Sequence, residues 1–307
     1  MKKTIPLFLC ALLLAALTGC GGGQQPAEGG DAALSVTATT YPVYCFTTAV
    51  TEGAEGVEVS LLVNQQTSCL HDYTLTVNDM KLLEGADVLV MNGVGLEDFL
   101  SYALGQLTAQ VIDCSQGVDL LPLEDGEGDG HSQSYDPHIW MDPQRAAVMV
   151  ENIAAQLSQL DSGNAQLYQD NAAQTVEQLT DLYHTWSDIF LPLDGPSLIT
   201  FHNGFAYLAD AFHFDILRSI EEEEGSEISA REMAELTQLI EEYQLPAIFT
   251  EVNGSDASAQ ALARDTGVKV YALSMVMSGD ESGILPYLSA IDQNMATIME
   301  GMEVTVS

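Results

Sequence analysis

Apolar positions along the chain form short runs that alternate with longer amphipathic stretches. The short runs are rich in β-branched residues and predict strands at 34–39, 57–63, 86–91, 109–114, 197–202, 214–219, 246–251 and 268–274. Helical periodicity fills the intervals, for example over 76–85, 143–160 and 229–244. Strands that alternate with helices predict parallel sheets built from βαβ units, here as two sets of four strands.

A long segment, 163–189, lies between the two sets of strands and contains no proline, and no glycine after its first residue. Its apolar residues recur at near-helical spacing, which predicts one helix of about 40 Å at 1.5 Å per residue. We therefore predict an α/β protein of two lobes, each a four-stranded, mostly parallel sheet with helices on both faces, joined by one long rigid helix. The lobes are expected at 34–160 and 191–307, with the linking helix at 161–190.

The first 33 residues predict export and anchoring. Residues 1–19 combine two lysines, an apolar run and small residues, as a secretory signal does, and the run is shorter than the roughly 20 residues of a membrane span. The "LTGC" that ends at Cys20 resembles the lipobox of bacterial lipoproteins, which implies cleavage before Cys20 and lipidation there. A simple signal peptide with an incidental cysteine is the alternative. Residues 20–33 are Gly-rich and polar, as a flexible tether is. The mature chain is thus expected on the extracytoplasmic side of the cell membrane, held by its lipid.

Charge excludes one class of partner. The chain has 45 acidic and 8 basic residues and a formal net charge of −37. Such a field repels nucleic acid and raises the local concentration of cations, so we expect no nucleic-acid partner. Most of this charge is interpreted as surface solubility rather than as a binding site.

The cysteines predict no thiolate metal site, because no CxxC pair is present. Cys45 follows the exit of the first predicted strand, and Cys69 follows that of the second. Loops after neighbouring parallel strands lie side by side, so a Cys45–Cys69 disulfide is geometrically plausible. Closing that loop could stabilise the fold by roughly 3 kcal/mol. Cys114 is then expected to be a buried free thiol.

Three of the six histidines fall where strands end. His71 follows the second predicted strand, His138 follows the fourth, and His202 closes the fifth. Ligands of open α/β sheets bind outside the carboxyl ends of the strands, so these imidazoles are placed to converge on one ligand. For any one of them taken alone, a buried structural histidine is the alternative. Imidazoles from two lobes suit a borderline-soft divalent cation such as zinc.

Other residues near strand ends complete this picture. Glu251 and Ser274 close the seventh and eighth predicted strands. Pro137 and Trp140 flank His138 and are interpreted as a rigid mount that limits motion of its ring. His184 and His213, by contrast, are expected to be structural or surface residues.

Five motifs in order along the chain carry a family resemblance. They are "TTYPVY" at 39–44, "LHDYTLTVNDMKLLEGADVLVMNGVGLEDFL" at 70–100, "DPHIWMDP" at 136–143, "TFHNGFAYLADAF" at 200–212 and "IFTEVNGSDASAQALARDTGVKVYALS" at 248–274. Together they resemble the metal-binding family of solute-binding lipoproteins of ABC transporters, the receptors of zinc and manganese importers. The resemblance extends from about residue 35 to near the C-terminus.

The resemblance implies two α/β lobes bridged by one rigid helix, with a metal ion held in the cleft between them. The family's first three ligands fall on His71, His138 and His202. Its fourth ligand, usually an aspartate, falls on Ser274, which is a departure because a hydroxyl is a poor neutral ligand for zinc. A water, Glu251 or Asp280 is then expected in the fourth position.

The loop at 124–134 occupies the place of a longer His- and acid-rich loop in many zinc-type members. It is acidic but contains a single histidine, His131. A plain solvated loop and a weak metal-gathering role both remain open for it.

The function expected is that of a high-affinity zinc receptor, a monomer that delivers the ion to the permease of an ABC importer. Three imidazoles without an aligned carboxylate favour Zn²⁺ over Mn²⁺, which prefers oxygen ligands. A manganese receptor of the same family is the nearest alternative. A secreted zinc hydrolase fits less well, because HExxH, GxSxG and GxxxxGK[ST] are all absent, so no enzyme is expected. A surface adhesin of the cell adhesion family with an incidental metal is the remaining alternative.

Overall fold

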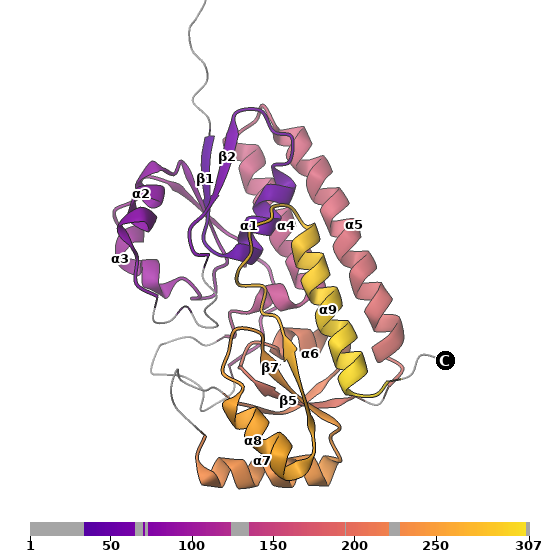
Figure 1. Cartoon of the computed structure of the whole chain (residues 1–307). Coiled ribbons are helices and arrows are strands. Elements are labelled where there is room, and N and C mark those ends of the chain that lie inside the picture. The colour runs from indigo at the N-terminus through magenta and orange to yellow at the C-terminus, as the bar shows by residue number, and fades with distance from the viewer. Residues whose placement is uncertain are drawn as a thin grey trace, which may run out of the picture. The chain divides into compact units, whose positions relative to one another are not determined.

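The computed structural model describes residues 34–64, 70, 73–123, 135–193, 195–220 and 228–304 (Figure 1). The predicted signal and tether with Cys20, the acidic loop at 124–134, and Cys69 and His71 lie outside these residues. Within the part of the chain that is described, no helix combines the length and the apolar character needed to cross a membrane.

The predicted strands are all present and form two four-stranded sheets of the same topology. They are β1 (Leu34–Ala38), β2 (Val57–Leu61), β3 (Val88–Met91), β4 (Gln110–Asp113), β5 (Ser197–Phe201), β6 (Asp215–Ser219), β7 (Ala247–Glu251) and β8 (Lys269–Leu273). The strand order is β2-β1-β3-β4 in one sheet and β6-β5-β7-β8 in the other, and every pairing between these strands is parallel. The α/β fold predicted from the alternation of strands and helices is confirmed.

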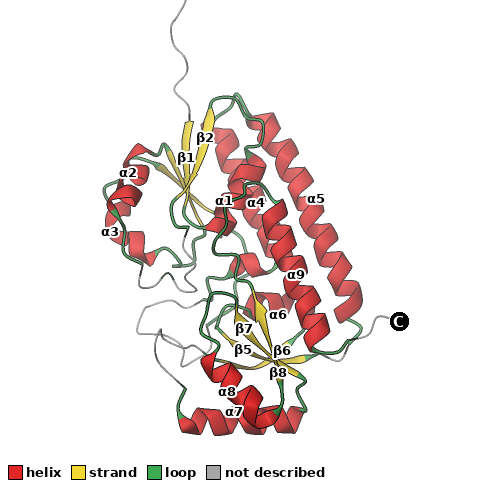
Figure 2. Cartoon of the chain, in the orientation of Figure 1, coloured by secondary structure: helices red, strands yellow, loops and turns green. Residues whose placement is uncertain are grey.

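Helices occupy the intervals between strands (Figure 2). They are α1 (Tyr41–Val50), α2 (Val77–Gly85), α3 (Ser101–Leu104), α4 (Pro143–Leu160), α5 (Ala165–Phe190), α6 (Ala206–Phe212), α7 (Ala230–Tyr243), α8 (Ala257–Thr266) and α9 (Leu285–Gly301), with short 3₁₀ turns η1 (Asp98–Leu100) and η2 (Ile139–Met141). Local signals set several of their starts. Ser229 and Glu232 form the capping box expected from their spacing at the start of α7, and Asp142 caps α4 directly before Pro143. The elements from β1 to α4 make the N-terminal lobe, and those from β5 to β8 make the C-terminal lobe.

Both sheets are covered on both faces. In the N-terminal lobe, α2 and α3 lie on one face of the sheet and α1 and α4 on the other (Figure 2). In the C-terminal lobe, neighbouring residues of β5 point into different cores. Ile199 packs in a core with Leu236 of α7 and Leu262 of α8, whereas Leu198 belongs to a larger core that includes Ile291 of α9. This alternation follows from the two-residue period of a strand.

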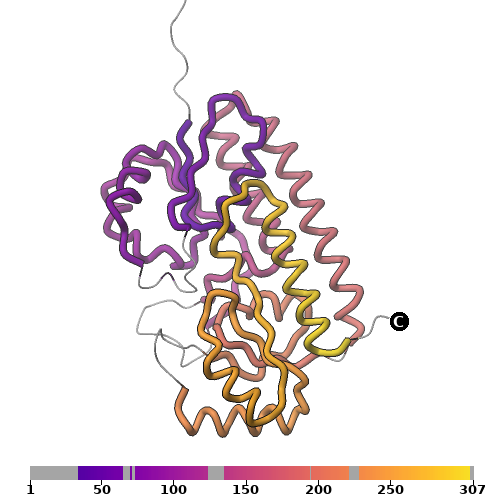
Figure 3. The backbone as a smooth tube through the Cα atoms, in the orientation of Figure 1, coloured from indigo at the N-terminus to yellow at the C-terminus, as the bar shows by residue number. Residues whose placement is uncertain are grey.

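The larger core is continuous through both lobes, because the long helices connect them. α5 has 26 residues and packs along α4, close to the predicted 163–189, and α9 returns beside α5 (Figure 3). Trp186 of α5 donates its Nε1–H to Asp292 of α9 over 3.0 Å, and the ring of Tyr287 of α9 lies 4.9 Å from that of Phe46 in α1. The last helix therefore packs on the N-terminal lobe as well as on β8 of the C-terminal sheet.

The shared strand order defines where a ligand is expected. In each sheet the second strand in space lies beside the third, β1 beside β3 and β5 beside β7, and the loops that follow these two strands diverge. Ligands of open α/β sheets bind at this switch point, outside the carboxyl ends of the strands. The residues that follow β1, β3, β5 and β7 are therefore the first to consider for function.

Candidate metal centre

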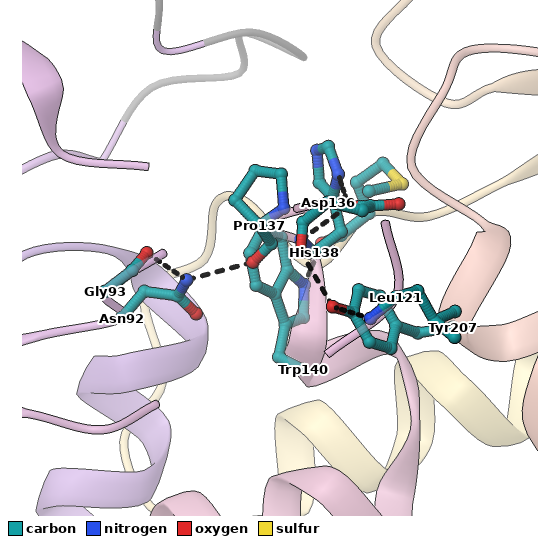
Figure 4. Close-up of polar contacts among 9 residues, drawn as sticks. Asn92, Gly93, Leu121, Asp136, Pro137, His138, Trp140 and Tyr207 are labelled. Carbon is teal, nitrogen blue, oxygen red and sulfur yellow. Dashed lines mark hydrogen bonds and ion pairs between the residues drawn. The ribbon is translucent and has the colours of Figure 1, made fainter. Parts of the chain in front are cut away.

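His138 is held by the carboxylate that precedes it by two residues. Oδ1 of the buried Asp136 accepts the backbone N–H of His138 over 2.8 Å and lies 2.7 Å from its Nδ1 (Figure 4). A carboxylate oxygen accepts, so in the neutral imidazole Nδ1 carries the proton and Nε2 has the lone pair. Such a contact orients an imidazole and raises its basicity as a metal ligand.

The backbone around His138 is fixed by contacts from both lobes. The Nδ2 of Asn92, directly after β3, donates to the carbonyl of Pro137 over 2.9 Å (Figure 4). The buried Trp140 donates its Nε1–H to the carbonyl of Met275 over 2.9 Å, and its own carbonyl accepts the hydroxyl of Tyr287 over 2.6 Å. The proline and the tryptophan thus hold the segment that presents His138.

His202 follows β5 and lies against the carboxylate that ends β7. Its Nδ1 is 3.7 Å from Oε2 of Glu251, and both residues are buried. Gly204 makes room for this ring, because a Cβ there would lie 2.9 Å from Cδ2 of His202 and 2.3 Å from Cε of Met275. The switch point of the C-terminal sheet therefore brings an imidazole and a carboxylate together.

The two histidines meet across the lobes. Their ring centroids are 5.7 Å apart and their planes are inclined by 85°. Zinc–nitrogen bonds of about 2.0–2.1 Å make this spacing compatible with two imidazoles on one ion. Within the described ranges, no group of three or more His, Cys, Asp or Glu side chains has metal-binding geometry. The third predicted histidine, His71, lies outside them, so the three-histidine site stays a prediction.

The other residues considered for the fourth position differ in their surroundings. The hydroxyl of Ser274 accepts the backbone N–H of Val276 over 3.1 Å, and both backbone polar groups of Ser274 bind the side chain of Asn294 over 2.7 Å each. Asp280 is exposed in the loop before α9. Of the three residues, Glu251 is the one that contacts His202.

The predicted Cys45–Cys69 disulfide is not supported. β1 ends at Ala38 and α1 begins at Tyr41, so Cys45 lies within the helix and faces the core rather than a strand-exit loop. It is a fully buried free thiol, and burial raises its pKa to about 12. Cys69 itself is outside the described residues. Cys114 is a buried free thiol, as expected.

Sequence reasoning missed a buried carboxylate at the switch point of the N-terminal sheet. Glu97 accepts the hydroxyl of Thr39 and the backbone N–H of Asn92, each over 2.7 Å, and the N–H of Gly93 over 3.1 Å. It therefore joins the exits of β1 and β3. Burial raises the pKa of Glu97 to about 7. A glutamate in the motif "NGVGLEDFL" was a local signal, but only the packed fold shows that it is buried.

The observations together define a two-lobed α/β protein in which oriented imidazoles from both lobes lie side by side. The family described as "Zinc-uptake complex component A periplasmic" matches residues 36–301, and the chain belongs to this family. The resemblance that the sequence motifs indicated is thereby confirmed. The family is one of substrate-binding receptors and not of enzymes.

Characterised relatives agree with this assignment. The zinc-binding lipoprotein AdcA of Streptococcus pneumoniae is 29% identical over 313 aligned residues, which cover 98% of this chain and 61% of AdcA. The chain thus spans about three fifths of the length of AdcA. The high-affinity zinc uptake system protein ZnuA of Bacillus subtilis is 27% identical over 316 aligned residues, covering 98% of both proteins.

Solved structures share the fold. A crystal structure of ZnuA superposes with a TM-score of 0.76 at 27% identity and covers 88% of this chain and 99% of that one. The laminin-binding adhesin Lmb of Streptococcus agalactiae gives a TM-score of 0.74 at 26% identity with the same coverage.

Proposed function

We propose that this protein is an extracytoplasmic zinc receptor that delivers the ion to the permease of an ABC importer. The observation that carries the proposal is the pairing of His138 and His202, whose rings lie 5.7 Å apart, each beside a carboxylate. The zinc-binding relatives AdcA and ZnuA support zinc as the cargo. The lipid anchor at Cys20 and the monomeric state belong to the same proposal.

The donor set favours Zn²⁺ over Mn²⁺. Imidazole suits zinc, whereas manganese prefers carboxylate, carbonyl and water oxygens. His71 supplies a third imidazole in this proposal, and Glu251 is the best-placed protein group for a fourth position because it already lies beside His202. A water or Asp280 are the other candidates for that position, while the hydroxyl of Ser274 is engaged with Val276.

The test is elemental analysis of protein purified without chelator, followed by competitive titration with zinc and manganese. We expect about one equivalent of zinc per chain and a preference for zinc over manganese. Replacing His138 by alanine should remove most of the binding, and His184→Ala, at an exposed position of α5, is the matched control. Tighter binding of manganese, or zinc held in full by His138→Ala, would disprove the assignment.

Adhesion is a second candidate, because the structural neighbour Lmb is a laminin-binding adhesin. Deletion of the gene separates the two functions. Loss of growth under zinc limitation, restored by added zinc, supports the receptor. Loss of attachment to laminin with zinc uptake intact supports the adhesin.

A further inference from the structure

Tyr207 contacts the His138 segment from the opposite lobe. It lies in α6, the helix that follows His202, and its side chain is fully buried. Its hydroxyl donates to the carbonyl of Asp136 over 2.8 Å and accepts the backbone N–H of Leu121 over 3.0 Å (Figure 4). Asp136 is also the residue whose carboxylate orients the ring of His138. One hydroxyl therefore connects the helix after His202 to the turn that presents His138.

The two backbone positions that Tyr207 binds are also joined to each other. The N–H of Asp136 donates to the carbonyl of Leu121 over 2.9 Å, and Pro122 and Tyr135 form an isolated antiparallel bridge. The hydroxyl of Tyr207 thus completes a small network of hydrogen bonds directly before His138 in the chain. Removing its hydroxyl would leave the buried carbonyl of Asp136 and the partly buried N–H of Leu121 without that partner. For the buried carbonyl, this loss costs more than the bond itself contributes.

A second set of contacts holds the aromatic ring of Tyr207 in place. Arg145 of α4 places its guanidinium 4.9 Å from the centroid of the Tyr207 ring. Its Nη1 lies 2.7 Å from Asp142 and 2.8 Å from Asp210 of α6, and its Nε donates to the carbonyl of Asp119 over 2.8 Å. The arginine therefore binds α6 to the N-terminal lobe on the ring face of Tyr207, while the hydroxyl binds the turn at the other end.

We propose that Tyr207 is a positioning residue of the metal site, which sets His138 relative to His202 before the ion binds. This inference rests on the proposed zinc-binding function. Because α6 begins shortly after His202, the backbone that carries one imidazole is fastened to the backbone that orients the other. When the ligands of a site are already in place, less free energy is needed to order them on binding. Such a site therefore binds its ion more tightly.

The test compares Tyr207→Phe with Tyr168→Phe. Tyr168 is also fully buried, and its hydroxyl donates to Asp161 over 2.6 Å at the start of α5. Both substitutions remove one buried hydroxyl with a hydrogen bond, so both should lower stability in denaturant unfolding of the metal-free protein. Zinc affinity is then measured by competition with a chelator dye, and ligand geometry by the visible absorption spectrum of the Co²⁺-substituted protein.

We expect Tyr207→Phe to weaken zinc binding by roughly 10- to 100-fold, as the loss of a group that orients a metal ligand does, and to change the Co²⁺ spectrum. Tyr168→Phe should bind zinc and cobalt like the unmodified protein. Unchanged affinity and spectrum in Tyr207→Phe, or equal losses in both variants, would overturn the inference. An unmodified protein that binds neither zinc nor cobalt would instead overturn the proposed function, and the inference with it.

A milder variant covers the case in which Tyr207→Phe does not fold. Asp210→Asn weakens the Arg145–Asp210 ion pair at a carboxylate that is 48% exposed. Zinc affinity should fall by about two- to fivefold, the range that a partly exposed ion pair contributes. Retention of full affinity in this variant would also count against the proposal.

Discussion

The rings of His138 and His202 lie 5.7 Å apart, although one precedes α4 in the N-terminal lobe and the other follows β5 in the C-terminal lobe. Each has a carboxylate at its Nδ1 side, Asp136 at 2.7 Å and Glu251 at 3.7 Å. The two lobes thus present the same chemical unit, an imidazole with an acidic neighbour. Zinc binding should therefore depend on that pair and on the residues packed around it.

Loss of either imidazole should abolish high-affinity zinc binding. For His138→Ala and His202→Ala we expect zinc affinity to fall by more than the roughly 10- to 100-fold that loss of an orienting group costs. Isothermal or dye-competition titration measures this. His184→Ala, at an exposed position of α5 beside Tyr183, should leave the affinity unchanged. Equal losses at His138 and His184 would show that the pair is not the site.

A methyl group at Gly204 should disturb the site. Its Cβ would come within 2.9 Å of the His202 ring and within 2.3 Å of Cε of Met275, so the ring or the methionine must move. We expect Gly204→Ala to weaken zinc binding by about tenfold, equivalent to roughly 1.4 kcal/mol. Gly85→Ala is the matched control, because a Cβ at Gly85 meets nothing within 4 Å. Zinc titration of both variants decides, and equal affinities would contradict the prediction.

A carboxylate at position 274 should tighten binding and broaden metal choice. In Ser274→Asp one carboxylate oxygen can accept the N–H of Val276, as the serine hydroxyl does, while the other oxygen can bind the ion. We expect zinc affinity to rise by about tenfold, or 1.4 kcal/mol, and manganese affinity to rise more, because manganese prefers oxygen ligands. Ser274→Asn has nearly the same shape without the charge and should give neither gain. An unchanged ratio of zinc to manganese affinity in Ser274→Asp would refute the idea.

Glu97 should make stability fall as the pH rises. Burial raises its pKa from 4.5 to about 7 in the folded protein. Between these values the folded state binds more protons at this group than the unfolded chain does, so its contribution to the free energy of unfolding decreases with pH. Across that window the decrease is on the order of 3 kcal/mol.

The measurement is urea unfolding of the metal-free protein between about pH 4.5 and 7.5. Glu97→Gln should flatten the pH dependence relative to the unmodified protein, whatever its effect at a single pH. Glu84→Gln, at an exposed position on α2, should retain the original slope. Parallel profiles for all three proteins would mean that Glu97 is not the group responsible.

Cys45 and Cys114 should both be free and both unreactive in the native protein. Burial raises the pKa of Cys45 to about 12 and the pKa of Cys114 well above its usual range. For Cys45 this means roughly three thousandfold less thiolate than at an exposed cysteine of pKa about 8.5. Alkylation without reductant, read by peptide mapping, should label both residues only after unfolding. A disulfide-linked peptide that contains Cys45 would restore the pairing that the structure argues against.

Local patterns were sufficient for the strands and for the start of α7. The strand β7 was expected at 246–251 and runs from Ala247 to Glu251, and the capping box of Ser229 and Glu232 forms as its spacing indicates. Both depend on residues a few positions apart, through alternating burial in a strand and hydrogen bonds within one helical turn. The loop position expected for Cys45 is wrong. α1 begins three residues after β1 ends, so the expected loop is absent and the thiol lies in the helix.

The sequence alone determined the fold class, the family and the candidate histidines, because strand periodicity, helix caps and ordered motifs are properties of neighbouring residues. Only the tertiary structure decided which groups act together. Glu97 is a strong pKa outlier because packing removes it from water, and Tyr207 reaches Asp136 because α6 packs against the N-terminal lobe. Such contacts depend on how two lobes pack through a shared core, and no spacing within one motif encodes the distance from Tyr207 to a carbonyl in the other lobe.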